Sequence, residues 1–248
     1  MSGSGGSSVG GMPDPTAQPG IDIRPLDTVD DVFRACEVLS EVWAGDPAGM
    51  PPNLLRALAH SGNYAVGLFD GERMIGASVG FFGEPAARSM HSHVTGVLAE
   101  YRSQGLGRVL KQHQREWALR RGVGHVTWTF DPLVARNAHF NLRVLGARVT
   151  EYLVDHYGPM DDGLNRGDET DRVMVSWAVA APPFPTPAAD RVVASVEVPH
   201  DIESVRAASP TDAADWRLRV RDGFLAQLGA GLVVGGFDDD RGYLFVRP

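Results

Sequence analysis

A strand, a glycine-containing turn, a helix and a second strand follow one another between Met90 and Phe130, and this order constrains the fold most strongly. The apolar run 90–98 predicts the first strand, and the run 125–130 predicts the second. Between them, residues 105–121 carry an apolar stripe at helical spacing. Because a helical crossover returns the chain to the starting end of the sheet, the two strands are expected to be parallel neighbours.

Antiparallel strands are expected before this unit. The runs 64–69 and 74–82 flank Asp70-Gly71, a strong hairpin signal, and a short strand from residue 21 leads into a helix over 29–43 capped by Asp27-Thr28. A helix over 134–145 ends at Gly146, and strands at 148–157 and 172–179 follow, joined by a polar loop over 161–171. The fold class is therefore α/β, in the form of an α+β mixed sheet with helices on its faces.

The chain divides into four regions by composition. Residues 1–20 are a low-complexity tail, 21–181 the main domain, 182–190 a proline-rich linker, and 191–248 an appended unit of strand, helix and hairpin. So few residues make a thin core, and the appended unit is expected to dock on the main domain or on a partner subunit, as in a homodimer.

Composition narrows the classes of function. A formal charge of -8 argues against a general nucleic-acid binder, and no apolar run is long enough to span a membrane. The single cysteine, Cys36, excludes an intramolecular disulfide framework, and the first residues do not form a signal peptide. We expect a water-soluble cytoplasmic protein.

The turn Arg102-Ser103-Gln104-Gly105-Leu106-Gly107 stands where a strand meets the start of a helix. Free N–H groups and the helix dipole favour an anion there, and a diphosphate with Arg102 and Arg108 beside it would fit. A tight structural turn is the simpler alternative. A Walker loop is excluded because Gly107 is not followed by Lys and Ser/Thr. A dinucleotide fingerprint is weakened because Leu110 stands where a third glycine is needed, although Asp131 lies near the spacing of a ribose-binding acid.

This turn, with Val97 five residues before Arg102, resembles the Arg/Gln-x-x-Gly-x-Gly/Ala motif of the GNAT superfamily of acyltransferases. The resemblance implies a parallel strand pair splayed at the acyl-CoA site. It also implies that acetyl-CoA or another short acyl-CoA is the co-substrate, and that the acceptor is an amine, expected to be a small molecule such as an amino acid. Its implied coenzyme contacts are the backbone of Val97, Leu98 and Ala99 for pantetheine, and residues 102–107 for the diphosphate.

The segment 128–133 with Arg136-Asn137-Ala138 and Leu145-Gly146-Ala147 is similar to a poorly characterised GNAT branch that carries a C-terminal extension. One departure matters for the chemistry. Many GNAT enzymes carry a tyrosine that protonates the leaving thiolate, and by spacing from Gly146 that position holds Leu142. Tyr152 and Tyr157 are weaker candidates for the acid, because strand tyrosines usually serve packing.

Amine acylation needs a base, and the alternation His91, His93, Thr95, Val97 predicts that these side chains share one face of a strand. We expect His93 and His91 to act as the base, against the alternative of structural histidines. A His-x-His metal site is disfavoured because no acidic or cysteine partner has a suitable spacing.

Three further polar residues are candidates for the site. Asp131 closes the second parallel strand and would orient a histidine or the amine, or would cap the next helix. Asn137 and Asn141 share a helical face and would bond pantetheine amides, or would be ordinary polar groups. The preferred function is direct acyl transfer without a metal. The alternatives are a non-catalytic acyl-CoA sensor and, more remotely, a nicotinamide dinucleotide oxidoreductase.

Overall fold

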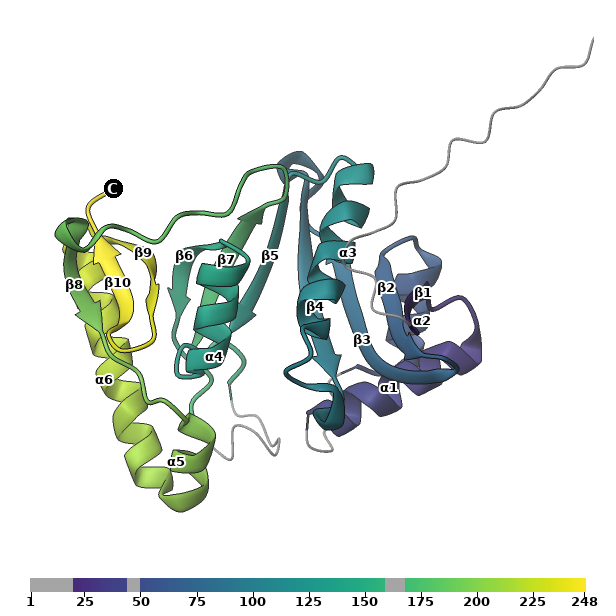
Figure 1. The fold of residues 1–248 in the computed structure, drawn as a ribbon, viewed down its shortest axis with the longest axis horizontal. Coiled ribbons are helices and arrows are strands. Elements are labelled where there is room, and N and C mark those ends of the chain that lie inside the picture. Colours follow the sequence, from purple (N-terminus) through teal and green to yellow (C-terminus); the bar gives the residue numbers. More distant parts are fainter. Residues whose placement is uncertain (1–19, 44–49, 159–167) are drawn as a thin grey trace, which may run out of the picture.

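Residues 20–43, 50–158 and 168–248 are described by a computed structural model, and a seven-stranded sheet of order β1-β2-β3-β4-β5-β7-β6 organises most of them (Figure 1). The first four strands are antiparallel: β1 (Ile21–Pro25), β2 (Tyr64–Asp70), β3 (Arg73–Phe82) and β4 (Ser89–Val97). The β2–β3 hairpin turns at Gly71, whose φ of 59° suits glycine, so the hairpin prediction is confirmed. The predicted tail lies outside the described residues except for Gly20.

Helices cover both faces of this half of the sheet. On one face lie α1 (Val29–Val42), which Thr28 and Asp31 close with a capping box, and α2 (Pro52–His60). α1 packs on β3 and β4, where Gly96 lies against Val42. On the other face lies α3 (Leu106–Arg120), whose Trp117 packs against Phe82. We call these the α1 face and the α3 face.

The parallel pair forms between β4 and β5 (His125–Phe130), but it is short. It pairs only Ser89 with His125, Met90 with Val126 and His91 with Thr127. Beyond His91 and Thr127 the strands separate, and β5 continues its ladder with β7 (Arg172–Ala178), which in turn pairs with β6 (Arg148–Leu153) at the edge. We call the opening between residues 92–97 and 128–130 the fork. The expected splayed pair is therefore confirmed.

The predicted helix over 134–145 has two parts. α4 (Ala135–Ala138) is α-helical, and it continues as a π-helical segment, η3 (His139–Val144). The wider turn is visible where Leu145 N donates to Phe140 O across five residues. π-helical turns are rare and concentrate near functional sites. The described residues also form three short 3-10 turns: η1 (Pro85–Ala87), η2 (Ala99–Tyr101) and η4 (Ala189–Arg191).

The appended unit forms a second sheet of order β8-β10-β9, and Figure 1 shows it beside β6, far from β1. Its elements are β8 (Val192–Val196), α5 (Ile202–Ala208), α6 (Pro210–Gly229), β9 (Val233–Asp238) and β10 (Gly242–Val246); α5 was not predicted. Phe224 of α6 packs on Tyr243 and Phe245 of its own unit and on Tyr152 of β6, with ring centroids 4.7–5.2 Å apart. Its thin core is therefore completed by the main domain of the same chain. Among the described helices, none is long and apolar enough to cross a membrane.

Candidate active site

The turn that leads from β4 into α3 holds a row of outward-facing backbone N–H groups. Ser103 and Gly105 adopt left-handed conformations, with φ of 63° and 78°, and α3 begins at Leu106. The N–H groups of Ser103, Gly105, Leu106 and Gly107 have no hydrogen-bond acceptor among the described residues. Successive free N–H groups at a helix N-terminus form an anion-binding concavity. We call residues 102–107 the anion turn.

The two glycines of the anion turn serve different needs. Gly105 has the positive φ that its turn requires. Gly107 has no such φ, and a methyl group added there would meet no described atom within 4 Å. Neither conformation nor packing against the described residues therefore explains Gly107. Arg102 and Arg108 are exposed beside the turn, and Leu106 is buried, so its side chain anchors the helix while its N–H stays open.

Only some of the backbone groups of β4 that were expected to contact pantetheine point into the fork. Leu98 N donates to Ile75 O at 2.9 Å, so its N–H is used by β3. The Leu98 N–H is therefore not free to bind a thioester carbonyl. Because backbone groups alternate in direction along a strand, Val97 and Thr95 direct their N–H and C=O groups away from β3 and into the fork. Ala99 lies in the exposed 3-10 turn η2.

A β-bulge changes the expected alternation on β4. Val79 pairs with Val94 while Gly80 pairs with Ser92, which leaves His93 as the extra residue. Ser92 therefore faces Lys111 of α3, and Thr95, bonded to Ser78 at 2.7 Å, also lies on the α3 face. The prediction that His91, His93, Thr95 and Val97 share one face is wrong, because the bulge reverses the phase between His93 and Thr95.

The two histidines lie together on the α1 face. Their ring centroids are 6.4 Å apart, and both contact the ring of Phe81, at 5.2 and 5.9 Å. Burial, and then the charge of His93, lower the pKa of His91 to about 4. His91 is thus neutral at pH 7, while His93 is exposed to solvent. Across the described parts of the chain, no cluster of three His, Cys, Asp or Glu side chains is arranged to hold a metal ion.

Hydroxyl groups line the β5 side of the fork on the face of His91. Thr127 Oγ1 lies 3.5 Å from His91 Nδ1, and two residues along, Thr129 Oγ1 lies 2.9 Å from the hydroxyl of Tyr157. Tyr157 follows β6 and is 46% exposed. The guanidinium of Arg172 lies 5.3 Å from its ring. We call His91, His93, Thr129, Tyr157 and Arg172 the acceptor face.

Asp131 occupies a different environment from the one expected of a catalytic group. Its carboxylate accepts hydrogen bonds from Arg206 at 2.6 Å and from Arg217 at 2.7 and 3.1 Å, and Asp168 shares both arginines. Asp131 Oδ1 also accepts from Leu133 N at 2.9 Å, as a capping residue does. Burial alone would raise its pKa, but Arg217 and Arg206 hold the pKa well below its usual value. Its partners are those of a structural ion pair, and neither histidine is among them.

The two asparagines are not equivalent. Asn141 is buried and its Oδ1 accepts from the indole N–H of Trp128 at 3.2 Å, so it ties η3 to β5. Its Oδ1, one of the two groups that could bond a pantetheine amide, is therefore held by Trp128. Asn137 is half-buried on α4 and makes no side-chain hydrogen bond to another described residue. Leu142 is buried, and so no acid stands at the position that departs from the family motif.

The two tyrosines considered as acids, Tyr152 and Tyr157, lie in different environments. Tyr152 is buried and donates to Asp171 Oδ2 at 2.6 Å, which commits its hydroxyl to the structure. Tyr157 keeps its hydroxyl at the fork beside Thr129. Of the predicted loop over 161–171, only residues 168–171 are described, and they are bonded to the appended unit through Arg206, Arg217 and Arg221.

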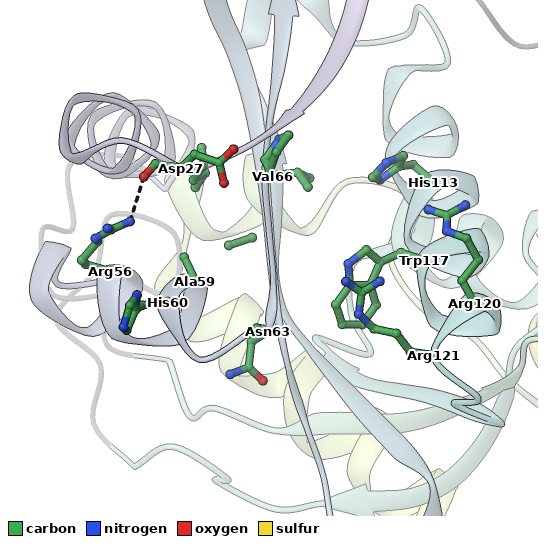
Figure 2. A pocket seen from close by; sticks show the side chains of 14 residues that line it. Asp27, Arg56, Ala59, His60, Asn63, Val66, His113, Trp117, Arg120 and Arg121 are labelled. Atoms are coloured by element: carbon green, nitrogen blue, oxygen red, sulfur yellow. Dashed lines mark hydrogen bonds between the residues drawn. The ribbon is translucent and has the colours of Figure 1, made fainter.

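A pocket of about 580 Å³ lies away from the fork, beside the start of β2 (Figure 2). Arg56 and His60 of α2 stand on one side of the strand, and His113, Trp117 and Arg121 of α3 on the other. None of the residues expected to bind the coenzyme or act as the base lines it. The fork, not this pocket, gathers the candidate chemistry.

Sequence reasoning missed Lys111, which sits at the closed end of the fork. Its Nζ donates to Ser92 Oγ at 2.8 Å and lies 4.1 Å from the ring centroid of Trp128. Its position on the edge of an apolar helical stripe made it look like a solvated residue. Its being the chain's single lysine was the one available signal.

The structure thus combines a mixed sheet that opens between two parallel strands with an anion turn at the head of the following helix. The sequence profile of the acetyltransferase (GNAT) family matches residues 29–147, so this part of the chain is a GNAT acetyltransferase domain. Enzymes of this family use acetyl-CoA as co-substrate, and the protein is an acetyltransferase.

Solved structures share the fold. The ribosomal-protein-S18-alanine N-acetyltransferase of Escherichia coli superposes with a TM-score of 0.54 at 17% identity, covering 65% of this chain and 96% of its own. An N-acetyltransferase of Staphylococcus aureus Mu50 gives 0.51 at 13%, covering 64% and 98%. An aminoglycoside 6'-acetyltransferase type Ii gives 0.51 at 12%, covering 66% and 99%. No curated protein matches the sequence. At such low identities, these superpositions establish the fold alone. Roughly a third of this chain lies outside each match.

Proposed function

We propose that the protein transfers a short acyl group from acyl-CoA to the amine of a small molecule that also carries a carboxylate, such as an amino acid. The observation that carries the proposal is the row of open N–H groups at Ser103, Gly105, Leu106 and Gly107, placed at the open end of the fork. A diphosphate on this turn directs the pantetheine arm along β4, where Val97 and Thr95 present backbone groups.

The acceptor approaches from the acceptor face. His93 is the base: it is exposed on the bulge, and an imidazole accepts a proton readily near neutral pH. His91, with its pKa of about 4, is a poor proton acceptor and orients His93 or a water between them. Arg172 is 9% exposed, with Nη1 bonded to Asp171 O, so it supplies a nearby positive charge for the acceptor's carboxylate. Tyr157 offers a hydroxyl to the acceptor's amine.

The reaction is direct. The ammonium loses one proton to His93 or its water, and the nitrogen attacks the thioester carbonyl carbon, whose oxygen accepts from a β4 N–H that points into the fork. The C–N bond forms, the C–S bond breaks, and the nitrogen loses its second proton. One of the two protons ends on the CoA thiolate and the other reaches solvent. Asp131 takes no part, because both of its carboxylate oxygens are bonded to buried arginines.

The test is release of free CoA with a panel of amines. We expect turnover above background with at least one amino acid, and weaker or no turnover with the matching amine that lacks the carboxylate. Binding of acetyl-CoA without CoA release for any amine would support the sensor alternative. Turnover confined to peptides or protein N-termini would overturn the small-molecule proposal.

A further inference from the structure

The closed end of the fork contains a buried cation that no described carboxylate pairs. Lys111 is 5% exposed and is the chain's single lysine. Its ammonium donates to Ser92 Oγ at 2.8 Å and to Gln114 Oε1 at 3.0 Å, and it lies over the Trp128 ring. Among the described residues, no carboxylate lies within ion-pair distance of it.

Burying this ammonium group lowers the stability of the folded protein, so we expect a functional reason for it. Burying a charge without an opposite charge disfavours the folded state, and most buried charges in proteins are paired. The same chain pairs two of its other buried cations, Arg206 and Arg217, with Asp131 and Asp168. Burial also lowers the pKa of Lys111 to about 7, as expected where no carboxylate compensates it.

The position of Lys111 relates it to the acyl group. Ser92 and Trp128 are the first residues on β4 and β5 after the last parallel pair, His91 with Thr127, so the ammonium lies where the fork closes. The anion turn lies at the other, open end of β4. A coenzyme whose diphosphate rests on that turn extends into the fork, and the tip of its acyl group is the part nearest Lys111.

We propose that the preferred acyl donor is a CoA thioester of a short dicarboxylic acid, such as succinyl-CoA, whose free carboxylate pairs with Lys111. This inference rests on the proposed function, because it requires acyl-CoA to occupy the fork. The ammonium supplies a charge-assisted hydrogen bond, and Ser92 and Gln114 hold it in place. An acetyl or butyryl group leaves the cation uncompensated.

The experiment compares succinyl-CoA with butyryl-CoA, which has the same chain length without the carboxylate. In the wild-type protein we expect kcat/KM to favour succinyl-CoA by about 10- to 100-fold, the size of one charged hydrogen bond. In Lys111→Met, which keeps the length of the side chain without its charge, the ratio should fall towards 1. Circular dichroism and thermal unfolding check that this variant folds.

A second readout needs no variant. Succinyl-CoA should raise the Tm of the wild-type protein more than butyryl-CoA at the same concentration, because tighter binding stabilises the native state further. Equal or better use of butyryl-CoA by the wild-type protein, with turnover intact, would overturn this inference and leave the proposed function standing. An equal loss for both donors in Lys111→Met would also overturn it and would assign Lys111 to the chemistry. Absence of binding by any acyl-CoA would instead remove the proposed function itself.

Discussion

Arg217 of α6 donates two hydrogen bonds to Asp131 at the end of β5, at 2.7 and 3.1 Å, across 86 residues of sequence. Arg217 is 1% exposed, so this pair joins the appended unit to the strand that forms one side of the fork. The unit therefore belongs to the structural support of the active site.

Replacing Arg217 by Met should destabilise the protein by about 3–5 kcal/mol, because Asp131 and Asp168 stay buried with one cation fewer. Urea unfolding measures the change. Arg219→Met, an exposed neighbour on the same helix, is the matched control and should change stability by less than about 1 kcal/mol. Similar losses in both variants would contradict a special role for the buried pair.

Gly107→Ala should separate ligand binding from folding. The added methyl meets no protein atom, and alanine favours a helix more than glycine, so stability should hold or rise by up to about 1 kcal/mol. Affinity for CoA, measured by calorimetry, should fall about 10-fold or more, since the methyl occupies the space of the diphosphate. Gly105→Ala is the contrasting variant: it forces alanine into a positive φ and should lower stability as well. Unchanged CoA affinity in Gly107→Ala would move the diphosphate away from the anion turn.

His93→Ala should lower kcat by about 100-fold while the affinity for acyl-CoA stays within a few-fold, because a base acts on the acceptor. Rates should be followed by CoA release from pH 5 to 9. In the wild-type protein, an acid limb near pH 6–7 cannot come from His91, whose pKa is about 4. His60→Ala on α2 serves as the control, and an equal loss of activity there would show that the effect is not specific.

Lys111→Met should stabilise the protein at pH 7 and change how its stability depends on pH. The folded pKa of about 7 lies below the 10.5 of an exposed lysine, so between these values the unfolded chain binds more protons. The wild-type protein therefore gains stability as the pH rises from 7 to 10, on the order of 1–4 kcal/mol from this group. Urea unfolding across this range should give curves for the two proteins that converge at high pH. Parallel curves would mean that Lys111 titrates normally.

Arg221→Met should weaken acceptor binding. Arg221 of α6 holds Asp171 at 2.6 and 2.8 Å, Asp171 Oδ1 accepts from Asp155 N, and neighbouring Thr170 accepts from Tyr157 N at 3.0 Å. Loosening Asp171 should therefore displace Tyr157 and raise the KM for the acceptor about 3- to 10-fold, with CoA affinity within twofold. A change confined to CoA affinity would disconnect this helix from the acceptor face.

The parts of the fold predicted from sequence depend on local signals. The hairpin at Gly71, the cap at Thr28 and the strand–turn–helix at the anion turn are each specified by residues a few positions apart. The insertion of β7 between β5 and β6, and the seat of the appended unit, depend on pairing between distant segments, for which period and spacing carry no information.

The candidate site was likewise predicted where local sequence signals decide the structure and missed where distant segments meet. The anion turn was predicted because its backbone geometry follows from the order strand, glycine and helix. A capping bond was among the predicted roles of Asp131, but its arginine partners were not predicted, because they lie 75 and 86 residues away. The face shared by His91 and His93 was only half predicted, since simple alternation cannot show a bulge.

The bulge on β4 makes His93 an additional residue in an otherwise regular strand. Without His93, Ser92 and Val94 would follow each other in ordinary alternation, and every other β4 side chain would keep its present face and its present partner on β3. β4 is thus a regular strand with one residue inserted, and the inserted residue is the histidine that reaches solvent at the fork. His93, the proposed base, can therefore be gained or lost by a single codon insertion or deletion while the sheet around it stays intact.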